Sequence, residues 1–209
     1  MKNEPKYTKV HILETITSGK PELPRPWWIL LVIILVGCSG QAYEPGVVED
    51  GNYYNLLAQF ALNKPESMSY EETSDISVQE IDPELYSRTE EMGVSDSLRL
   101  EYMLSGEKAD LYIYSEDNKE GYLVVAFVDF IKNSIEKNTD MEVESVYDLH
   151  QEAPFRCLVA SNDTYEKRYY VTFADESFVY IVMTGKKDEL ASLSEEENPM
   201  NYVYGYWGE

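Results

Sequence analysis

A serine followed three residues later by a lysine occurs twice in this chain, as Ser105–Lys108 and as Ser134–Lys137. A lysine at this spacing can help to activate a serine hydroxyl for nucleophilic attack. The Ser-Asp-Asn and Lys-Thr-Gly sequences that complete such a site are absent from the chain, and so is a Gly-x-Ser-x-Gly nucleophile elbow. We therefore predict no serine catalysis.

Side chains that bind zinc are sparse. The sequence holds two histidines and two cysteines, and beyond its first 38 residues only His150 and Cys157 remain, which are too few for a zinc site. The acidic segment 116–121 offers oxygen atoms and a glycine, but Phe127 stands where a calcium loop needs its closing glutamate. We predict no metal and no cofactor, and we interpret Asp117–Glu120 as a helix cap.

Neighbouring carboxylates could catalyse the hydrolysis of glycosidic bonds if they were held in a pocket. The acidic runs Glu71–Glu72, Glu90–Glu91 and Glu195–Glu197 all lie in polar segments. No carboxylate is embedded in an apolar pattern that would raise its pKa. These residues are expected to be solvated surface, and the chain is not expected to be an enzyme.

Tyrosine is the one compositional excess, with 18 residues in 209. Tyrosine and tryptophan stack on sugars and form the centres of protein interfaces. Tyrosine is also a good strand former that tolerates half-burial. The aromatic cluster at the C-terminal end is the preferred candidate binding surface: Tyr202, Tyr204, Tyr206 and Trp207.

The stretch Leu35-Val36-Gly37-Cys38 ends the apolar run Trp27–Val36 and is followed by Ser39-Gly40. A small residue before a cysteine, at the end of a short apolar segment, resembles the lipobox of bacterial lipoproteins. The resemblance covers about residues 20–40. It implies that a diacylglycerol is joined to the Cys38 thiol and that the bond between Gly37 and Cys38 is cut. The mature chain would then begin at Cys38, held to the cell membrane by its lipid.

The ten-residue apolar run suits a secretory signal, whose apolar region has about 7–15 residues. A membrane-spanning helix needs roughly 20 residues. Residues 1–26 carry five basic and three acidic side chains, a balance typical of segments kept on the cytoplasmic side. Those residues are either a genuine extension of the signal or the result of a start codon placed too early. An uncleaved membrane anchor is the alternative to the lipoprotein interpretation.

The chain is strongly acidic. Its net charge of −22 becomes about −24 without residues 1–37, which hold five of the 17 basic and three of the 39 acidic residues. Such a surface repels nucleic acid and favours basic partners. With Cys38 lipidated, no intramolecular disulfide can form. Cys157 alternates with Phe155 and Val159, which predicts a small, buried apolar residue.

The first half of the mature chain changes from helical to strand periodicity. Apolar residues recur at helical spacing over 53–61 and predict a helix there. Residues 64–95 predict a long loop with a short helix near Pro83–Met92. Alternation over 98–104 predicts a strand, with its hairpin partner at 111–114.

The second half predicts a central helix followed by strands. Apolar residues from Leu123 to Lys137 favour a helix, although β-branched valines leave a strand over 122–128 as an alternative. The strongest hairpin signal joins 169–173 to 178–182 through a turn centred on Asp175-Glu176. Further predicted elements are strands at 141–149 and 155–159 and a short helix within 187–195. The aromatic segment 202–207 is expected either to add an edge strand or to lie over an apolar groove.

Together these patterns predict an α+β fold, with an antiparallel sheet of about five or six strands packed against one or two helices. We expect a signal peptide over residues 1–37, a lipidated cysteine and tether over 38–50, and a single extracytoplasmic domain over 51–209. The expected function is a non-enzymatic binding module in the cell envelope, with a protein, peptide or glycan ligand and no nucleic acid. An envelope hydrolase and an immunity or accessory lipoprotein are the alternatives, and the cysteine usage favours a Gram-positive cell.

Overall fold

The computed structural model describes residues 44–92, 95–118, 121–146, 155–174 and 176–206. The described residues belong to one compact unit. The fold is α+β and its sheets are antiparallel, as the sequence predicts. Cys38 and Gly37 lie outside the described residues, and strand β1 begins within the segment predicted as a tether.

The larger sheet has seven strands, more than the five or six predicted. Its strand order is β4-β5-β6-β10-β9-β8-β7. The strands, in that order, are Ser69–Glu71, Arg99–Ser105, Asp110–Asp117, Ser177–Lys186, Tyr165–Ala174, Arg156–Ser161 and Glu142–Val146. The hairpin predicted around residues 175–176 is confirmed, because Ala174 pairs with Ser177 at the end of β9 and β10.

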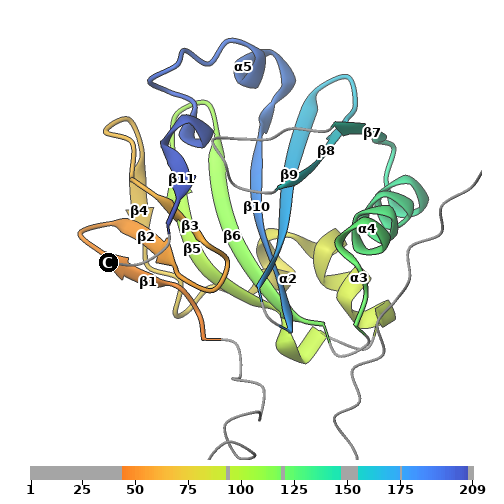
Figure 1. Cartoon of the computed structure of the whole chain (residues 1–209). Helices are drawn as coiled ribbons and strands as arrows, with labels where there is room; N and C mark the ends of the chain where they lie inside the picture. Colours follow the sequence, from red (N-terminus) through yellow and green to blue (C-terminus); the bar gives the residue numbers. More distant parts are fainter. Residues whose placement is uncertain (1–43, 93–94, 119–120, 147–154, 175, 207–209) are drawn as a thin grey trace, which may run out of the picture. The chain divides into compact units, whose positions relative to one another are not determined.

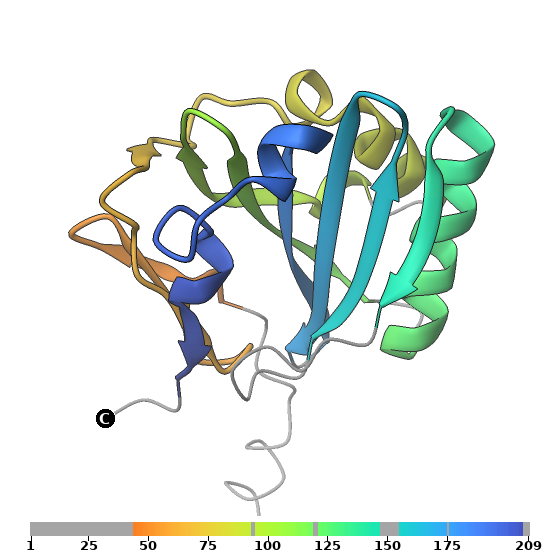
Figure 2. The same ribbon diagram turned by 90° about the horizontal axis from the view of Figure 1, so that it is seen from above.

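The smaller sheet has four strands in the order β1-β2-β3-β11. They are Val47–Glu49, Asn52–Asn55, Phe60–Leu62 and Val203–Gly205. Strand β11 is the edge strand expected as one of two alternatives at the C-terminal end, and it pairs with β3. The small sheet and the helices α3 and α4 lie on opposite sides of the large sheet (Figure 2).

The helices are α2 (Val78–Ile81), α3 (Pro83–Met92), α4 (Val124–Asn138) and α5 (Lys187–Ala191), with single 3₁₀ turns at Ser95–Ser97 and Pro199–Tyr202 (Figure 1). The helices predicted near 83–92, 123–137 and 187–195 are confirmed. The strand alternative for 122–128 is wrong, because α4 begins at Val124 and turns its apolar side chains toward the sheet.

Strand β10 is the centre of the large sheet and is buried on both faces. Every side chain from Phe178 to Met183 is at most 1% exposed. Because successive side chains of a strand point to opposite faces, β10 contributes to two cores. Val179, Ile181 and Met183 enter one core, and Phe178, Tyr180 and Val182 enter the other.

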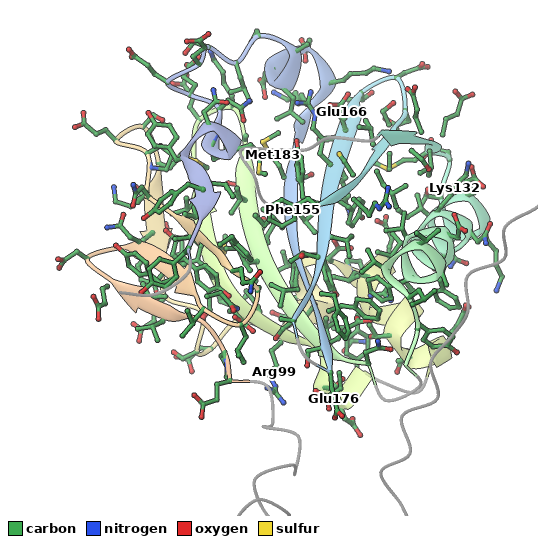
Figure 3. All side chains as sticks on the ribbon, viewed as in Figure 1. Arg99, Lys132, Phe155, Glu166, Glu176 and Met183 are labelled. Atoms are coloured by element: carbon green, nitrogen blue, oxygen red, sulfur yellow. The ribbon has the colours of Figure 1, made fainter. Side chains whose placement is uncertain are left out.

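The first core lies between the two sheets. Phe60 of the small sheet packs edge-to-face on Phe155, with ring centroids 5.4 Å apart, and Tyr53 lies 5.4 Å from Tyr102. Cys157 belongs to this core and is 5% exposed, which confirms its predicted burial. Figure 3 shows Phe155 and Met183 in the interior, in contrast to Lys132 on the outer side of α4.

The second core lies between the large sheet and helices α3 and α4. Phe127 of α4 stacks on Phe178 of β10 with ring centroids 3.8 Å apart. The guanidinium of Arg88, from α3, lies over the Phe127 ring, 4.9 Å from the ring centroid. An arginine in this position brings a positive charge into an apolar layer, and a buried charge needs a partner.

That partner is Glu116 on β6. The Arg88 guanidinium donates two hydrogen bonds to its carboxylate, at 3.2 and 2.7 Å, and Tyr180 donates a third at 3.1 Å. Both charged side chains are at most 1% exposed. Burial alone would lower the pKa of Arg88, but the charge and hydrogen bonds of Glu116, together with Tyr180 and Tyr169, outweigh burial and raise that pKa. Glu116 is therefore a fully buried carboxylate that its local sequence did not reveal.

A second ion-pair group holds the start of α3 on the sheet. Lys167 of β9 contacts Asp82 at 3.3 Å and Glu84 at 2.7 Å. Asp82 also accepts a hydrogen bond from the backbone of Leu85 and so caps the first turn of α3. Burial raises the pKa of Asp82 even though Lys167 lowers it. Asp82 is thus a second carboxylate in a setting that its local sequence did not reveal.

The predicted helix over residues 53–61 is wrong, because this segment is the β2–β3 hairpin. Asn55 accepts a hydrogen bond from the Ala58 backbone at 2.8 Å, and Gln59 has a φ of 58° that closes the turn. The chain reverses over four residues, so Asn55 faces Phe60. Apolar residues on either side of such a turn imitate helical spacing, although Leu56 points to solvent and is 56% exposed.

The predicted cap at Asp117–Glu120 is also wrong. Asp117 is the last residue of β6, and the residue before α4 is Leu123, whose side chain makes no cap hydrogen bond. Asn118 instead closes the connection, accepting from the Tyr122 backbone at 2.8 Å and donating to its carbonyl at 2.9 Å. The later part of the strand predicted over 141–149 lies outside the described residues, while Glu142–Val146 form β7.

Replacing Arg88 with Met is expected to lower the free energy of unfolding by about 3–5 kcal/mol, because Glu116 would remain as a buried, uncompensated charge. The double variant Arg88→Met with Glu116→Gln removes both charges and should recover most of that loss. Chemical denaturation measures both effects. Lys132→Met, which removes an exposed ion pair on α4, is the control and should change stability by at most about 1 kcal/mol.

Alkaline pH should destabilise the fold through its buried tyrosines. Burial raises the pKa of Tyr112 to about 12 and also raises that of Tyr102, Tyr114, Tyr169 and Tyr180. In the unfolded chain a tyrosine ionises near pH ~10. The stability that the buried, neutral tyrosines contribute below that pH is therefore lost as the pH rises toward their higher pKa values in the folded protein. Chemical denaturation at a series of pH values, from neutral to above ~10, should show the free energy of unfolding decline. The decline should be smaller in the Tyr112→Phe variant. Ionisation of all tyrosines near pH ~10 with intact near-ultraviolet dichroism would contradict the prediction.

Candidate functional site

A solvent-open groove lies along the small sheet. Its volume is about 490 Å³. Its lining comes from the approach to β1, from β1 itself, from the end of β2 and the turn that follows, and from the C-terminal end. These residues are Glu44, Pro45, Val47, Glu49, Tyr54, Asn55, Leu56, Leu57 and Tyr206. A groove of this size falls in the range of ligand-binding sites, about 300–1,000 Å³.

Two tyrosine rings form the aromatic part of the groove. Tyr54 and Tyr206 lie with ring centroids 5.5 Å apart and an interplanar angle of 57°. The neighbouring Tyr204 donates a hydrogen bond to the Asn63 side chain at 3.3 Å. Partial burial, together with Tyr54 and Tyr206, raises the pKa of Tyr204. Three tyrosines therefore meet on one face of the small sheet.

Strand register explains why these rings meet. Val47 pairs with Tyr54, Tyr54 pairs with Ala61, and Ala61 pairs with Tyr204. Residues that face one another across an antiparallel sheet share one face, so this row runs across all four strands. The adjacent row carries Tyr53 and Leu62, which face inward and belong to the first core. In the outer row Ala61 is buried, while Val47, Tyr54 and Tyr204 are left for contacts with solvent or a ligand.

Two of the most exposed apolar side chains in the described part of the chain line this groove. Val47 is 57% exposed and Leu56 is 56% exposed. Leu56 is held outward by the β2–β3 turn, where Gln59 donates a backbone hydrogen bond to the Leu56 carbonyl at 3.3 Å. An exposed apolar side chain is common by itself, but a group around a concave surface is typical of an interaction site.

The charged side chains that line the groove are acidic. Glu44 and Glu49 both line it and both are exposed. No lysine or arginine is among its lining residues in the part of the chain that the structure describes. Because field lines concentrate in concave surfaces of one charge sign, the groove should attract positively charged groups.

The approach to β1 is fixed by Gly46. Its backbone N–H donates to Glu101 of β5 at 2.9 Å, and the Tyr53 hydroxyl donates to the same carboxylate oxygen. A Cβ atom at Gly46 would lie 2.3 Å from the buried Tyr53 ring. Only glycine therefore lets the chain pass this close, and Glu101 ties that passage to the large sheet.

The structure separates the four predicted binding residues. Tyr206 lines the groove and Tyr204 lies beside it. Tyr202 is half-buried, packs against the first core and donates from its hydroxyl to the Glu196 carbonyl at 3.2 Å. Trp207 lies outside the described residues. Tyr54 was missed, because its segment carries the spacing of a helix and residues 52–55 show no alternation of apolar and polar side chains that would indicate a strand.

The residues weighed for catalysis do not converge on the groove. Ser134 accepts a hydrogen bond from Asn138 within α4, while Lys137 pairs with Glu91 at 3.1 Å. Lys108 pairs with Glu197 at 2.8 Å, and its hydrogen bond, together with hydrogen bonds to Ser194, lowers the pKa of that carboxylate to about 2. The buried carboxylates of Glu116 and Asp82 are bound to cations in the helix layer. In the described ranges, no cluster of three or more His, Cys, Asp or Glu side chains could hold a metal ion.

Comparisons with known proteins identify no family for this chain. No protein-family model matches it, and no curated protein matches it. Among solved structures, it is similar to the solution structure of cyanobacterial PsbP (CyanoP) from Synechocystis sp. PCC 6803, with a TM-score of 0.43 and 9% sequence identity. The match covers 81% of this chain and 97% of that chain. A similarity this low adds nothing to the assignment of the groove.

Helices in the described residues are too short or too polar to cross a membrane. The predicted signal and lipid-bearing cysteine lie before the first described residue, Glu44.

Proposed function

We propose that this chain is a bacterial lipoprotein, anchored by a diacylglycerol on Cys38, whose domain is a non-enzymatic binding module on the extracytoplasmic side of the cell membrane. The groove on the small sheet is its binding surface. The observation that carries the binding role is the meeting of Tyr54 and Tyr206 with exposed apolar side chains in one solvent-open groove.

Support for the anchor comes from the sequence. Cys38 follows a small residue and a ten-residue apolar run, as in lipoprotein signals. The described domain begins six residues later, at Glu44, and its groove is lined by that residue and by β1. An anchored protein of this kind would present the groove to other molecules of the envelope.

Support for binding, rather than hydrolysis, comes from the position of the carboxylates. Glu44 and Glu49 at the groove are exposed to solvent. The enclosed carboxylates of Asp82 and Glu116 contact the side chains of Lys167 and Arg88 on the other face of the large sheet. Aromatic side chains at an open concave surface suit recognition of a peptide, protein or glycan.

Metabolic labelling with a palmitate analogue tests the anchor. The wild-type chain should carry the label and begin at Cys38 by mass spectrometry, while Cys38→Ala should carry none. Cys157→Ala, which removes the buried thiol, is the control and should keep the label. An unlabelled wild-type chain that retains Met1 would contradict the anchor.

Peptide and glycan arrays test the binding role. The full-length chain in non-ionic detergent should bind a subset of spots, and Tyr206→Ala should lose at least about three quarters of that signal, since aromatic anchors dominate interfaces. Tyr165→Ala, at a tyrosine of β9 that is 50% exposed, is the matched control and should keep it. Equal losses for both variants, or no signal for the wild type, would exclude the groove.

A further inference from the structure

We infer that the groove binds an extended peptide segment in which lysine or arginine alternates with apolar residues. This inference rests on the proposed binding role and adds the chemical class of the ligand. Three features of the groove carry it: the charge of its lining, the nature of its rings and apolar side chains, and the position of β1 in the sheet.

The charge of the lining selects a cation. Glu44 and Glu49 are the charged side chains of the groove, and both are exposed. The whole chain carries a net charge of −22, so long-range attraction also favours a basic partner. An acidic ligand would meet repulsion both at a distance and at the groove.

The rings favour a cation attached to an apolar stem. Tyr54 and Tyr206 offer ring faces, and a lysine or arginine head within about 6 Å of such a face is attracted to it. The long stems of these side chains pack on apolar surface while the charged head stays in water. Val47 and Leu56 provide that apolar surface beside the two carboxylates.

The strand order favours a peptide over a small amine. Strand β1 is an edge of the four-stranded sheet, with β2 as its one neighbour among the described strands. An edge strand can pair with an extended chain, which then places alternate side chains on one face. Val47 and Glu49 of β1 both line the groove, so a peptide beside β1 would present every second side chain to it.

Fluorescence anisotropy with labelled probe peptides tests this inference. The full-length chain in non-ionic detergent is titrated into short peptides of alternating lysine and valine, serine and valine, or glutamate and valine. The salt concentration is about 0.15 M, where exposed charges more than ~8 Å apart are largely screened. The lysine peptide should bind, and the other two should bind at least about tenfold more weakly.

A pair of charge-matched variants separates the groove from the general acidic surface. Glu44→Gln with Glu49→Gln should weaken binding of the lysine peptide by about fivefold or more, in line with two exposed ion pairs. Glu71→Gln with Glu72→Gln removes the same charge from exposed residues at β4 and should change binding by less than about twofold. Near-ultraviolet dichroism of each variant confirms that the fold is kept.

Each other result overturns the inference in a distinct way. Equal weakening by the two variant pairs would mean that the acidic surface as a whole attracts the peptide. Equal binding of the serine peptide, lost in Tyr206→Ala, would keep the groove as a binding site but exclude a cationic ligand. No binding of any peptide, together with array signals that do not depend on Tyr206, would exclude the proposed function as well.

Discussion

Burial of strand β10 on both faces is the constraint on which the rest of the domain depends. Its side chains from Phe178 to Met183 are closed to solvent on either side of the sheet. Each face of such a sheet must be covered by a separate layer. Helices α3 and α4 cover one face, and the small sheet covers the other. The small sheet then has an outer face with nothing further to bury, and the groove forms there.

The distribution of charge follows from the same arrangement. The chain has only 17 basic side chains against 39 acidic ones. Arg88 lies inside the helix layer bound to Glu116, and Lys167 joins β9 to Asp82 and Glu84 at the start of α3. Because these two basic side chains neutralise carboxylates beneath the surface, they do not offset the acidic side chains exposed to solvent. The groove, lined by Glu44 and Glu49 without a basic side chain in the described residues, reflects this imbalance locally.

Periodicity predicted the elements whose one face is buried and whose turns are short. The β9–β10 hairpin and α4 both carry a regular apolar pattern, and both were located correctly. Periodicity failed at the β2–β3 hairpin. There a four-residue turn separates Tyr53 from Phe60, so the two residues have helical spacing in the sequence although both reach the core from neighbouring strands. A one-dimensional pattern does not distinguish a helix from two short strands joined by such a turn.

The candidate binding site was only partly predicted, and the reason is related. Tyr204 and Tyr206 are in an aromatic run and were visible in the sequence, whereas Tyr54 joins them only through the register β1-β2-β3-β11. The burial of Glu116 is similar: its partners Arg88 and Tyr180 are 28 and 64 residues away. Such long-range pairs depend on the order of strands in the sheet, which local composition does not encode.

Hydrogen exchange of the full-length chain, with and without the lysine–valine peptide, tests the assignment of the groove most directly. A peptide that pairs with β1 and covers the two tyrosines should slow amide exchange in residues 44–57 and 204–206 and leave α3 and α4 unchanged. Protection confined to the helix layer, or exchange that is the same in every segment with the peptide bound, would contradict the groove as the ligand site.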